Sequence, residues 1–162
     1  MKIVVTAFKG KHNSSAVLLD AVKNDDCIKA FLTNSFVGCE REIRELLLLH
    51  KPEMVLSFGL RPDIDQLQIE TAAGMNDHLL HTNYDVAVLE NSLAKAGISY
   101  QISSKPTCYL CNHVYFKGLE CIRQHGLDTK MVFIHVPSMK RFQQLEFALR
   151  WLEGILYEEI NS

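Results

Sequence analysis

The sequence has no long hydrophobic run. Its longest apolar stretches, such as Leu46 to Leu49, are far shorter than the ~20 residues that a membrane-spanning helix needs. The N-terminus opens with a strand-like apolar segment rather than the charged region and apolar core of a secretory signal. We therefore expect no membrane partner and a cytoplasmic location.

An excess of charge of one sign is also lacking. The chain has 17 Lys and Arg residues against 19 Asp and Glu residues, for a formal net charge of −2. It contains no dense block of basic residues and no basic stripe with interleaved aromatic residues, which are typical of nucleic-acid-binding proteins. The sequence therefore predicts no nucleic-acid partner.

Cysteine is too scarce, and its count is odd, for a complete disulfide framework. The five cysteines lie in a chain of 162 residues that is 48% apolar, which is long enough to bury a core without crosslinks. Three of them occupy positions typical of a core or a helix face: Cys27, Cys39 and Cys121.

The other two cysteines, Cys108 and Cys111, form a C-x-x-C pair. This spacing is compatible with a thiol redox pair at the start of a helix. It is also half of a zinc site, but a second pair of ligands at suitable spacing is missing, although His113 is near. We expect no metal and no cofactor. The loop at residues 8–14 lacks both common glycine-rich phosphate-binding motifs, so nucleotide binding is a weaker alternative.

Strand-like and helix-like segments alternate along the chain. Strands are expected at residues 2–7, 28–32, 54–58, 67–71, 98–103 and 131–135. Helices are expected after the cap at Asn13 and at residues 40–50, 82–96, 109–125 and 139–157, with a loose segment at 72–81. Continuous apolar strands joined by long helices are typical of a parallel sheet covered on both faces. The sequence predicts one α/β domain, residues 1–162, folded as a three-layer αβα sandwich with a mostly parallel central sheet.

Cys111 and His135 are the residues that suggest chemistry. Cys111 follows a predicted strand and a short loop, so it is expected in the first turn of the next helix. A helix N-terminus and a nearby imidazolium can lower the pKa of a cysteine from about 8.5 to roughly 3.5–7.5. His135 lies near the end of an apolar strand, at the carboxyl edge where open α/β sheets bind ligands. A buried structural cysteine and a core histidine are the alternative interpretation.

Several segments together resemble a known family. They are Val4–Phe8, Asn13–Ser15, Leu32–Phe36, Lys51–Gly59, Cys111–His113 and Phe133–Pro137, of which the last two are the most specific. The chain resembles the pyroglutamyl peptidase I family of cysteine peptidases, which remove an N-terminal pyroglutamate from peptides and share a three-layer, phosphorylase/hydrolase-like α/β fold. The resemblance implies that Cys111 is the nucleophile and His135 the general base. It also implies a small peptide or acyl-amide substrate and a homo-oligomer, either a dimer or a tetramer.

The resemblance also suggests a substrate pocket. By position, Phe8 and Tyr109 are the aromatic side chains that flank the five-membered lactam, with Leu110 and Asn34 beside them. The glycine-rich loops of the family are shortened here, so the pocket is expected to differ in shape and to admit another small acyl group.

The third catalytic residue is where the chain departs from the family. The family places a Glu six residues after the arginine that matches Arg61, and ungapped counting puts Leu67 there. Leucine cannot orient an imidazole. Glu70 is the candidate replacement if a bulge or a gap shifts the alignment, although on a regular strand it faces away from Leu67. The family's Arg-Ile-Pro-Asp-Asn segment is replaced here by residues 72–77, in which Asn76 and Asp77 are the candidate remnant.

Two other functions remain open on the sequence alone. One is a catalytically degenerate binding protein of the same fold, suggested by Leu67 and the missing arginine segment. The other is a thiol redox protein that uses Cys108 and Cys111.

Overall fold

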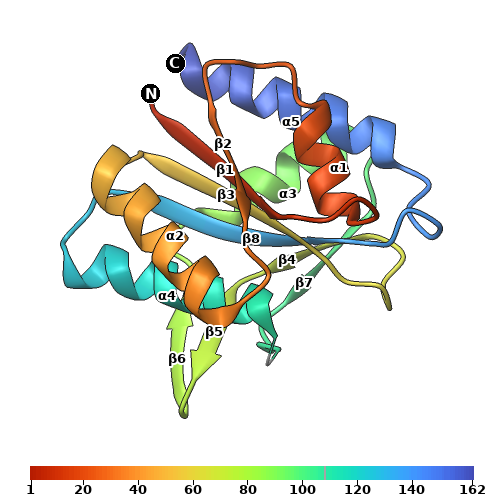
Figure 1. The fold of residues 1–162 in the computed structure, drawn as a ribbon. Coiled ribbons are helices and arrows are strands. Elements are labelled where there is room, and N and C mark those ends of the chain that lie inside the picture. The colour runs from red at the N-terminus through yellow and green to blue at the C-terminus, as the bar shows by residue number, and fades with distance from the viewer. Residues whose placement is uncertain (108) are drawn as a thin grey trace.

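The computed structural model describes residues 1–107 and 109–162. At its centre is a six-stranded sheet in the order β2-β1-β3-β8-β4-β7 (Figure 1). The strands are β1 (Ile3–Phe8), β2 (Ile28–Leu32), β3 (Met54–Leu60), β4 (Leu67–Glu70), β7 (Tyr100–Ser103) and β8 (Lys130–Val136). Strands β2, β1, β3 and β8 run parallel, whereas β4 runs antiparallel to β8 and parallel to β7. The predicted mostly parallel sheet is confirmed.

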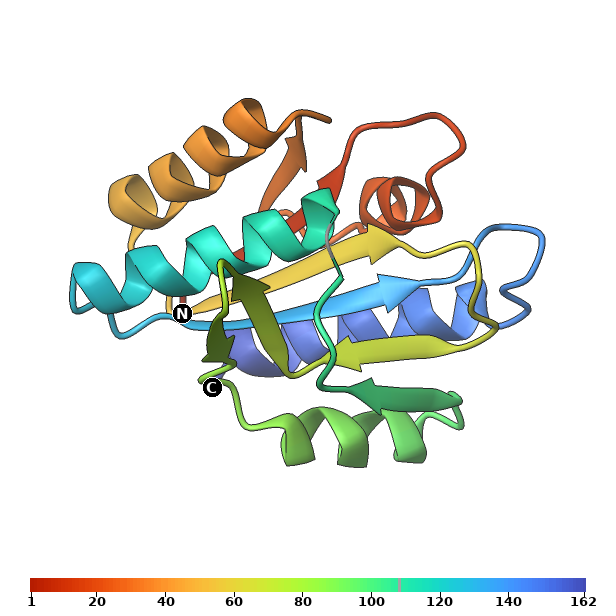
Figure 2. The same ribbon diagram turned by 90° about the horizontal axis from the view of Figure 1, so that it is seen from below.

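Helices cover both faces of this sheet. They are α1 (Ser14–Ala21), α2 (Phe36–His50), α3 (Val86–Lys95), α4 (Leu110–Gln124) and α5 (Leu145–Ile160). Helices α2 and α4 pack on one face, and α1, α3 and α5 pack on the other (Figure 2). The three-layer αβα sandwich expected from the sequence is therefore confirmed.

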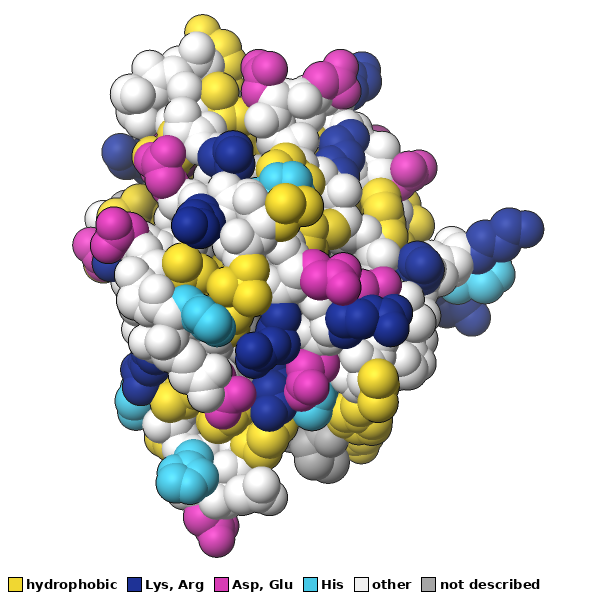
Figure 3. All heavy atoms as spheres, turned by 60° about the vertical axis from the view of Figure 1, so that its left-hand side comes forward, with side chains coloured by type: hydrophobic (Ala, Val, Ile, Leu, Met, Phe, Trp, Pro, Cys, Tyr) yellow, Lys and Arg dark blue, Asp and Glu magenta, His cyan; other side chains and the backbone are white. Residues whose placement is uncertain are grey.

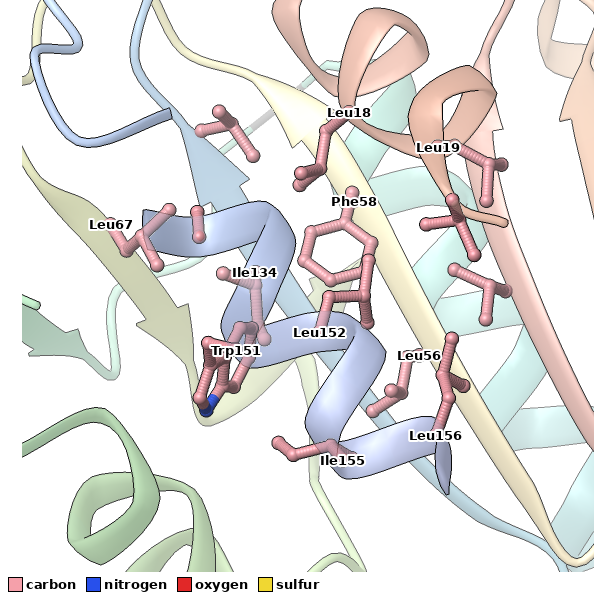
Figure 4. Packing of buried hydrophobic residues seen from close by; sticks show 14 of the residues in the cluster. Leu18, Leu19, Leu56, Phe58, Leu67, Ile134, Trp151, Leu152, Ile155 and Leu156 are labelled. Atoms are coloured by element: carbon pink, nitrogen blue, oxygen red, sulfur yellow. The ribbon is translucent and has the colours of Figure 1, made fainter. Parts of the chain in front are cut away.

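The central strands are apolar throughout because each face of the sheet meets a helical layer. In β1, Val4 and Phe8 join the cluster under α2 and α4, whereas Ile3, Val5 and Ala7 join the opposite cluster. Figure 4 shows this opposite cluster, in which α5 residues pack against β3, β4 and β8. Its labelled members are Leu18, Leu19, Leu56, Phe58, Leu67, Ile134, Trp151, Leu152, Ile155 and Leu156.

The segment that the sequence suggested to be loose, residues 72–81, is a β-hairpin. Strands β5 (Ala72–Met75) and β6 (His78–His81) pair antiparallel and project at the bottom of Figure 1. Asn76 and Asp77 form the turn with φ angles of +49° and +64°, as a two-residue hairpin turn requires. The sequence prediction was wrong here because the strands are short and the turn is Asn-Asp rather than the more recognisable Asn-Gly.

Helix α3 begins later than expected. Asp85 caps it by accepting a hydrogen bond from the Ala87 N–H at 3.1 Å, whereas the predicted helix starts at residue 82. Thr82 instead donates from its hydroxyl to the Met131 carbonyl at 2.6 Å. Thr82 is therefore engaged in a hydrogen bond to β8, a strand that is distant in the sequence, and does not cap the helix.

Helix α5 also begins later than predicted, at Leu145 rather than near Met139. The preceding segment forms turns, in which the N–H groups of Arg141 and Phe142 donate to the Ser138 carbonyl. The apolar positions of residues 139–144 therefore belong to the turn that leads into the helix.

The surface carries a mixture of charges. On the face shown in Figure 3, basic and acidic side chains are interspersed with small apolar patches, and no continuous field of one charge is seen on that face. None of the helices formed by the described residues contains an apolar stretch able to span a bilayer.

The packing of α5 gives a direct test of the fold. Leu152 is fully buried, so Leu152→Ala is expected to lower the free energy of unfolding by about 2–5 kcal/mol, because it removes apolar contacts and leaves a cavity. Tyr157 lies on the same helix and is 67% exposed, so Tyr157→Ala is expected to change the free energy of unfolding by less than about 0.5 kcal/mol. Urea denaturation measures both. Equal effects of the two substitutions would contradict this packing of α5.

Candidate active site

The residues singled out by the sequence meet at one edge of the sheet. Cys111 is the second residue of α4, and His135 is the last residue but one of β8. Both line a cleft of about 570 Å³ together with Leu60 at the end of β3. The carboxyl ends of parallel strands commonly form such a site, and the sequence expectation for these two positions matches the geometry.

Glu70 is held against His135 by the pairing of β4 with β8. In this antiparallel ladder Gln68 lies opposite His135 and Glu70 lies opposite Phe133. Glu70 and His135 are therefore diagonal neighbours on one face of the sheet, within reach of long side chains. The His135 Nδ1 and Glu70 Oε1 atoms are 2.9 Å apart, and each residue is 4% exposed.

Ungapped counting, which placed the acidic position at Leu67, was wrong. Leu67 is fully buried in the opposite layer, among the residues that pack against α5. Residues 61–66 form the loop before β4, so the distance from Arg61 to the acidic residue is counted across a loop and not along a strand. Loops accept inserted residues without disturbing the sheet. Glu70, which points away from Leu67 as the strand period predicts, occupies the position beside the imidazole.

Glu70 is buried, and only some of its oxygen atoms accept hydrogen bonds. The Tyr115 hydroxyl donates to the Glu70 main-chain carbonyl at 2.8 Å. Arg61 Nη1 lies 3.9 Å from Oε1. Oε2 is buried and has no hydrogen-bond partner among the residues that the structure describes. The carboxylate therefore has few donors apart from the imidazole.

Gly59 makes room for the thiol. A Cβ atom at Gly59 would lie 2.5 Å from the Cys111 Sγ and 2.7 Å from the Phe133 Cζ, distances too short for real contacts. Gly59 is also the residue paired with His135 in the sheet. Sγ consequently lies against the strand position beside His135, and Cys111, His135 and Glu70 share the lining of a small cavity of about 10 Å³.

The start of α4 leaves backbone donors beside the thiol. Tyr109 is the N-cap and makes no side-chain capping bond, and the N–H of His113 is the first to bond back to the Tyr109 carbonyl. The N–H groups of Leu110, Cys111 and Asn112 therefore have no partner within the helix. Such groups can stabilise negative charge that develops on a bound carbonyl oxygen.

Burial determines the protonation of the thiol. It is the main reason that the pKa of Cys111 is raised to about 12, with smaller contributions from nearby Cys39 and Glu70. The lowered pKa expected from the sequence was wrong, because the favourable helix terminus is outweighed by the loss of water around the sulfur. Cys111 is thus a neutral thiol near pH 7 and needs a base to become a nucleophile.

The four predicted substrate residues line one cleft next to Cys111. Phe8, Asn34, Tyr109 and Leu110 surround a volume of about 340 Å³. Sequence reasoning missed three further residues of this lining: Asn13, Phe36 and Leu60. Phe36 is an aromatic residue two positions after Asn34, and this spacing is the sequence signal that could have identified it.

Asn112 connects the start of α4 to the β5–β6 hairpin. Its side-chain oxygen accepts from the Gly74 N–H at 2.9 Å, and its side-chain nitrogen donates to the Gly74 carbonyl at 2.8 Å. The hairpin that replaces the family's arginine segment is therefore fixed to the residue that follows Cys111. Asn76 and Asp77 form the hairpin turn and are absent from the lining of both clefts.

The redox and metal alternatives depend on the cysteines and on how the possible metal-binding side chains are grouped. Cys108, one half of the C-x-x-C pair, lies outside the described residues. Among those that are described, Cys27, Cys39, Cys111 and Cys121 are free thiols. The described residues contain no group of three or more His, Cys, Asp or Glu side chains arranged to hold a metal ion.

The curated proteins that this chain matches are named pyrrolidone-carboxylate peptidases. The chain is 25% identical to the pyrrolidone-carboxylate peptidase of Clostridium botulinum, over 85% of this chain and 78% of that protein. It is 24% identical to the pyrrolidone-carboxylate peptidase of Thermosipho melanesiensis, over 85% and 83% of the two chains.

Solved structures have the same fold. The pyrrolidone carboxyl peptidase of Thermococcus litoralis aligns with a TM-score of 0.80 at 21% identity, over 99% of this chain and 96% of that one. Pyroglutamyl peptidase I of Bacillus amyloliquefaciens aligns with a TM-score of 0.82 at 16% identity, over 94% and 93%. The sequence model of the pyroglutamyl peptidase family matches residues 76–146, which include Cys111 and His135. The chain is thus similar in sequence to the pyroglutamyl peptidase family over residues 76–146, and it shares the fold of the solved pyroglutamyl peptidases.

Proposed function

We propose that the protein is a cysteine peptidase that hydrolyses the amide bond after an N-terminal pyroglutamyl, or similarly small, acyl group. The observation that carries this proposal is the buried 2.9 Å contact between Glu70 and His135, beside a cysteine in the first turn of a helix. The names of the relatives, which are pyrrolidone-carboxylate peptidases, support the same reaction.

The first half of the reaction forms an acyl-enzyme. Glu70 accepts a hydrogen bond from His135 Nδ1–H, which leaves Nε2 as the acceptor for the Cys111 proton. As this proton moves to Nε2, Sγ attacks the amide carbonyl carbon, and the N–H groups at the start of α4 that have no partner within the helix stabilise the oxyanion. His135 then gives the proton to the departing amine, the C–N bond breaks, and a thioester remains.

The second half releases the acyl group. Water attacks the thioester carbonyl while His135 Nε2 takes a proton from it. The C–S bond breaks, and the proton on His135 returns to the thiolate of Cys111. These steps use only side chains, backbone N–H groups and water, so the proposal requires no cofactor.

The lining of the two clefts supports one orientation of the substrate. Cys111 lines both, whereas His135 lines only the 570 Å³ cleft. The general acid must reach the leaving amine, so the amine side of the bond belongs in the 570 Å³ cleft. The acyl group then occupies the 340 Å³ cleft, whose aromatic residues match the flat face of a lactam.

Two asparagines suit the polar edge of a lactam. The Asn34 side-chain nitrogen donates to the Lys9 carbonyl at 2.8 Å, which leaves its oxygen as an acceptor. The Asn13 side-chain oxygen caps α1, which leaves its nitrogen as a donor. A lactam presents an N–H and a C=O side by side, so we propose that Asn34 and Asn13 bind these two groups.

A reduced thiol at Cys111 is required by this mechanism, in keeping with the cytoplasmic location expected from the sequence, which stays a prediction. The expected dimer or tetramer likewise stays a prediction.

Substitutions at the three central residues test the proposal. The wild type is expected to hydrolyse a fluorogenic pyroglutamyl amide, and Cys111→Ala and His135→Ala are expected to abolish turnover. Glu70→Gln removes the charge that stabilises the imidazolium, so it is expected to lower kcat/KM by about 10²–10⁴-fold. Cys121→Ala removes a buried thiol from the same helix away from the cleft and serves as the control.

Full activity in Cys111→Ala or His135→Ala would eliminate the peptidase assignment. A wild-type protein that binds a pyroglutamyl peptide without hydrolysing it would favour a non-catalytic binding protein instead. Isothermal titration with the intact peptide distinguishes binding from turnover.

Gly59 provides an independent test of how the thiol is placed. In Gly59→Ala the new Cβ collides with Sγ and Phe133, so the thiol must move away from the position beside His135. We expect turnover to fall strongly while circular dichroism still reports a folded protein. Gly154→Ala, where nothing lies within 4 Å of the added Cβ, is the matched control. Unchanged turnover in Gly59→Ala would contradict this placement of Cys111.

A further inference from the structure

Arg61 lies next to the Glu70–His135 pair and is anchored at two points. Its Nε donates to Asp63 Oδ1 at 2.9 Å, and its Nη1 donates to Gln68 Oε1 at 2.8 Å. Gln68 is the residue directly opposite His135 in the β4–β8 ladder and is 8% exposed. The guanidinium is therefore held at a defined place beside the pair rather than free in solvent.

The negative charge of Glu70 must be stabilised by neighbouring groups at this buried position. Its side chain is 5% exposed, and its Oε2 atom has no partner among the described residues. A buried carboxylate is costly unless donors or a cation compensate for the lost water. In the part of the chain that the structure describes, Arg61 supplies the only Lys or Arg nitrogen within 4 Å of this carboxylate, at 3.9 Å.

The other groups that face Glu70 do not replace this cation. His135 approaches from β8, and Cys111 and Tyr115 approach from α4. On the other side, the β7 residues paired with Gln68 and Glu70 are Gln101 and Ser103, which do not titrate. Asp63 also forms an ion pair with Arg61, but it carries a negative charge and its side chain is mostly exposed.

We propose that Arg61 is a positioning residue for the reaction: its positive charge keeps Glu70 in the ionised form that accepts the Nδ1–H of His135, so that Nε2 remains free to take the Cys111 proton. A protonated Glu70 would instead donate to Nδ1 and leave the remaining proton on Nε2, which could then no longer act as the base. The part of this inference that concerns catalysis rests on the proposed function, whereas its effect on the reactivity of the thiol does not.

The direction of the pH effect follows from the charge. A cation disfavours the binding of a further proton nearby, so removal of Arg61 lets the Glu70–His135 pair become protonated at a higher pH. In a profile of Cys111 reactivity against pH, the low-pH limb should therefore move to higher pH in a variant without this charge.

The experiment compares Arg61→Gln, Arg61→Lys and Arg141→Gln in the full chain. Arg141 is a matched control because it binds Asp65 and the Pro62 carbonyl, and so anchors the same loop without approaching Glu70. The rate of Cys111 alkylation by iodoacetamide, followed by mass spectrometry, is measured against pH, as is kcat/KM for a pyroglutamyl amide. Arg61→Gln is expected to move the low-pH limb of both profiles up by about one unit, which is about a tenfold loss on that limb. Arg61→Lys and Arg141→Gln are expected to keep the wild-type limb.

A second variant tests the same charge without disturbing Arg61 itself. Asp63 is exposed, so Asp63→Asn is not expected to affect folding, and it removes the negative charge that partly neutralises the guanidinium. The low-pH limb should move in the opposite direction, to lower pH. An unchanged limb in Arg61→Gln, or the same upward shift in Arg61→Lys or Arg141→Gln, would overturn the proposal. If alkylation shifts as expected but the wild type hydrolyses no pyroglutamyl amide, the positioning role stands and the proposed function fails.

Discussion

The hydrogen bond between Glu70 and His135 is the interaction on which the site depends. It exists because β4 runs antiparallel to β8 in a sheet whose other central strands are parallel. This pairing places Gln68 opposite His135 and Glu70 on the adjacent diagonal, so both polar side chains of β4 face the imidazole. A parallel β4 would give a different register and a different set of neighbours.

The same short strand also contributes to the core. Leu67 and Ile69 point into the layer covered by α5, whereas Gln68 and Glu70 lie on the face of the sheet that carries His135. The period of two along a strand thus separates an apolar anchor from a polar site within four residues. The buried Leu67 and Ile69 side chains hold the strand in place, and the strand in turn fixes the carboxylate.

Much of the fold could be predicted because it depends on local pattern. The continuous apolar runs identified all six strands of the main sheet, and the loop before Cys111 placed that residue correctly in the first turn of a helix. Glu70 was difficult to assign because the count from Arg61 crosses a loop, where length varies freely. The pKa of Cys111 could not be predicted because burial comes from packing, including nearby Cys39 on α2, which lies far away in the sequence.

The most direct test of the central interaction is a proton NMR spectrum of the His135 ring. A Nδ1 proton shared with a buried carboxylate should give a resonance well downfield of the backbone amides and should exchange slowly with water. One such resonance is expected in the wild type, and it should disappear in Glu70→Ala and persist in Cys111→Ala. Its absence from the folded wild type, or its survival in Glu70→Ala, would contradict the account.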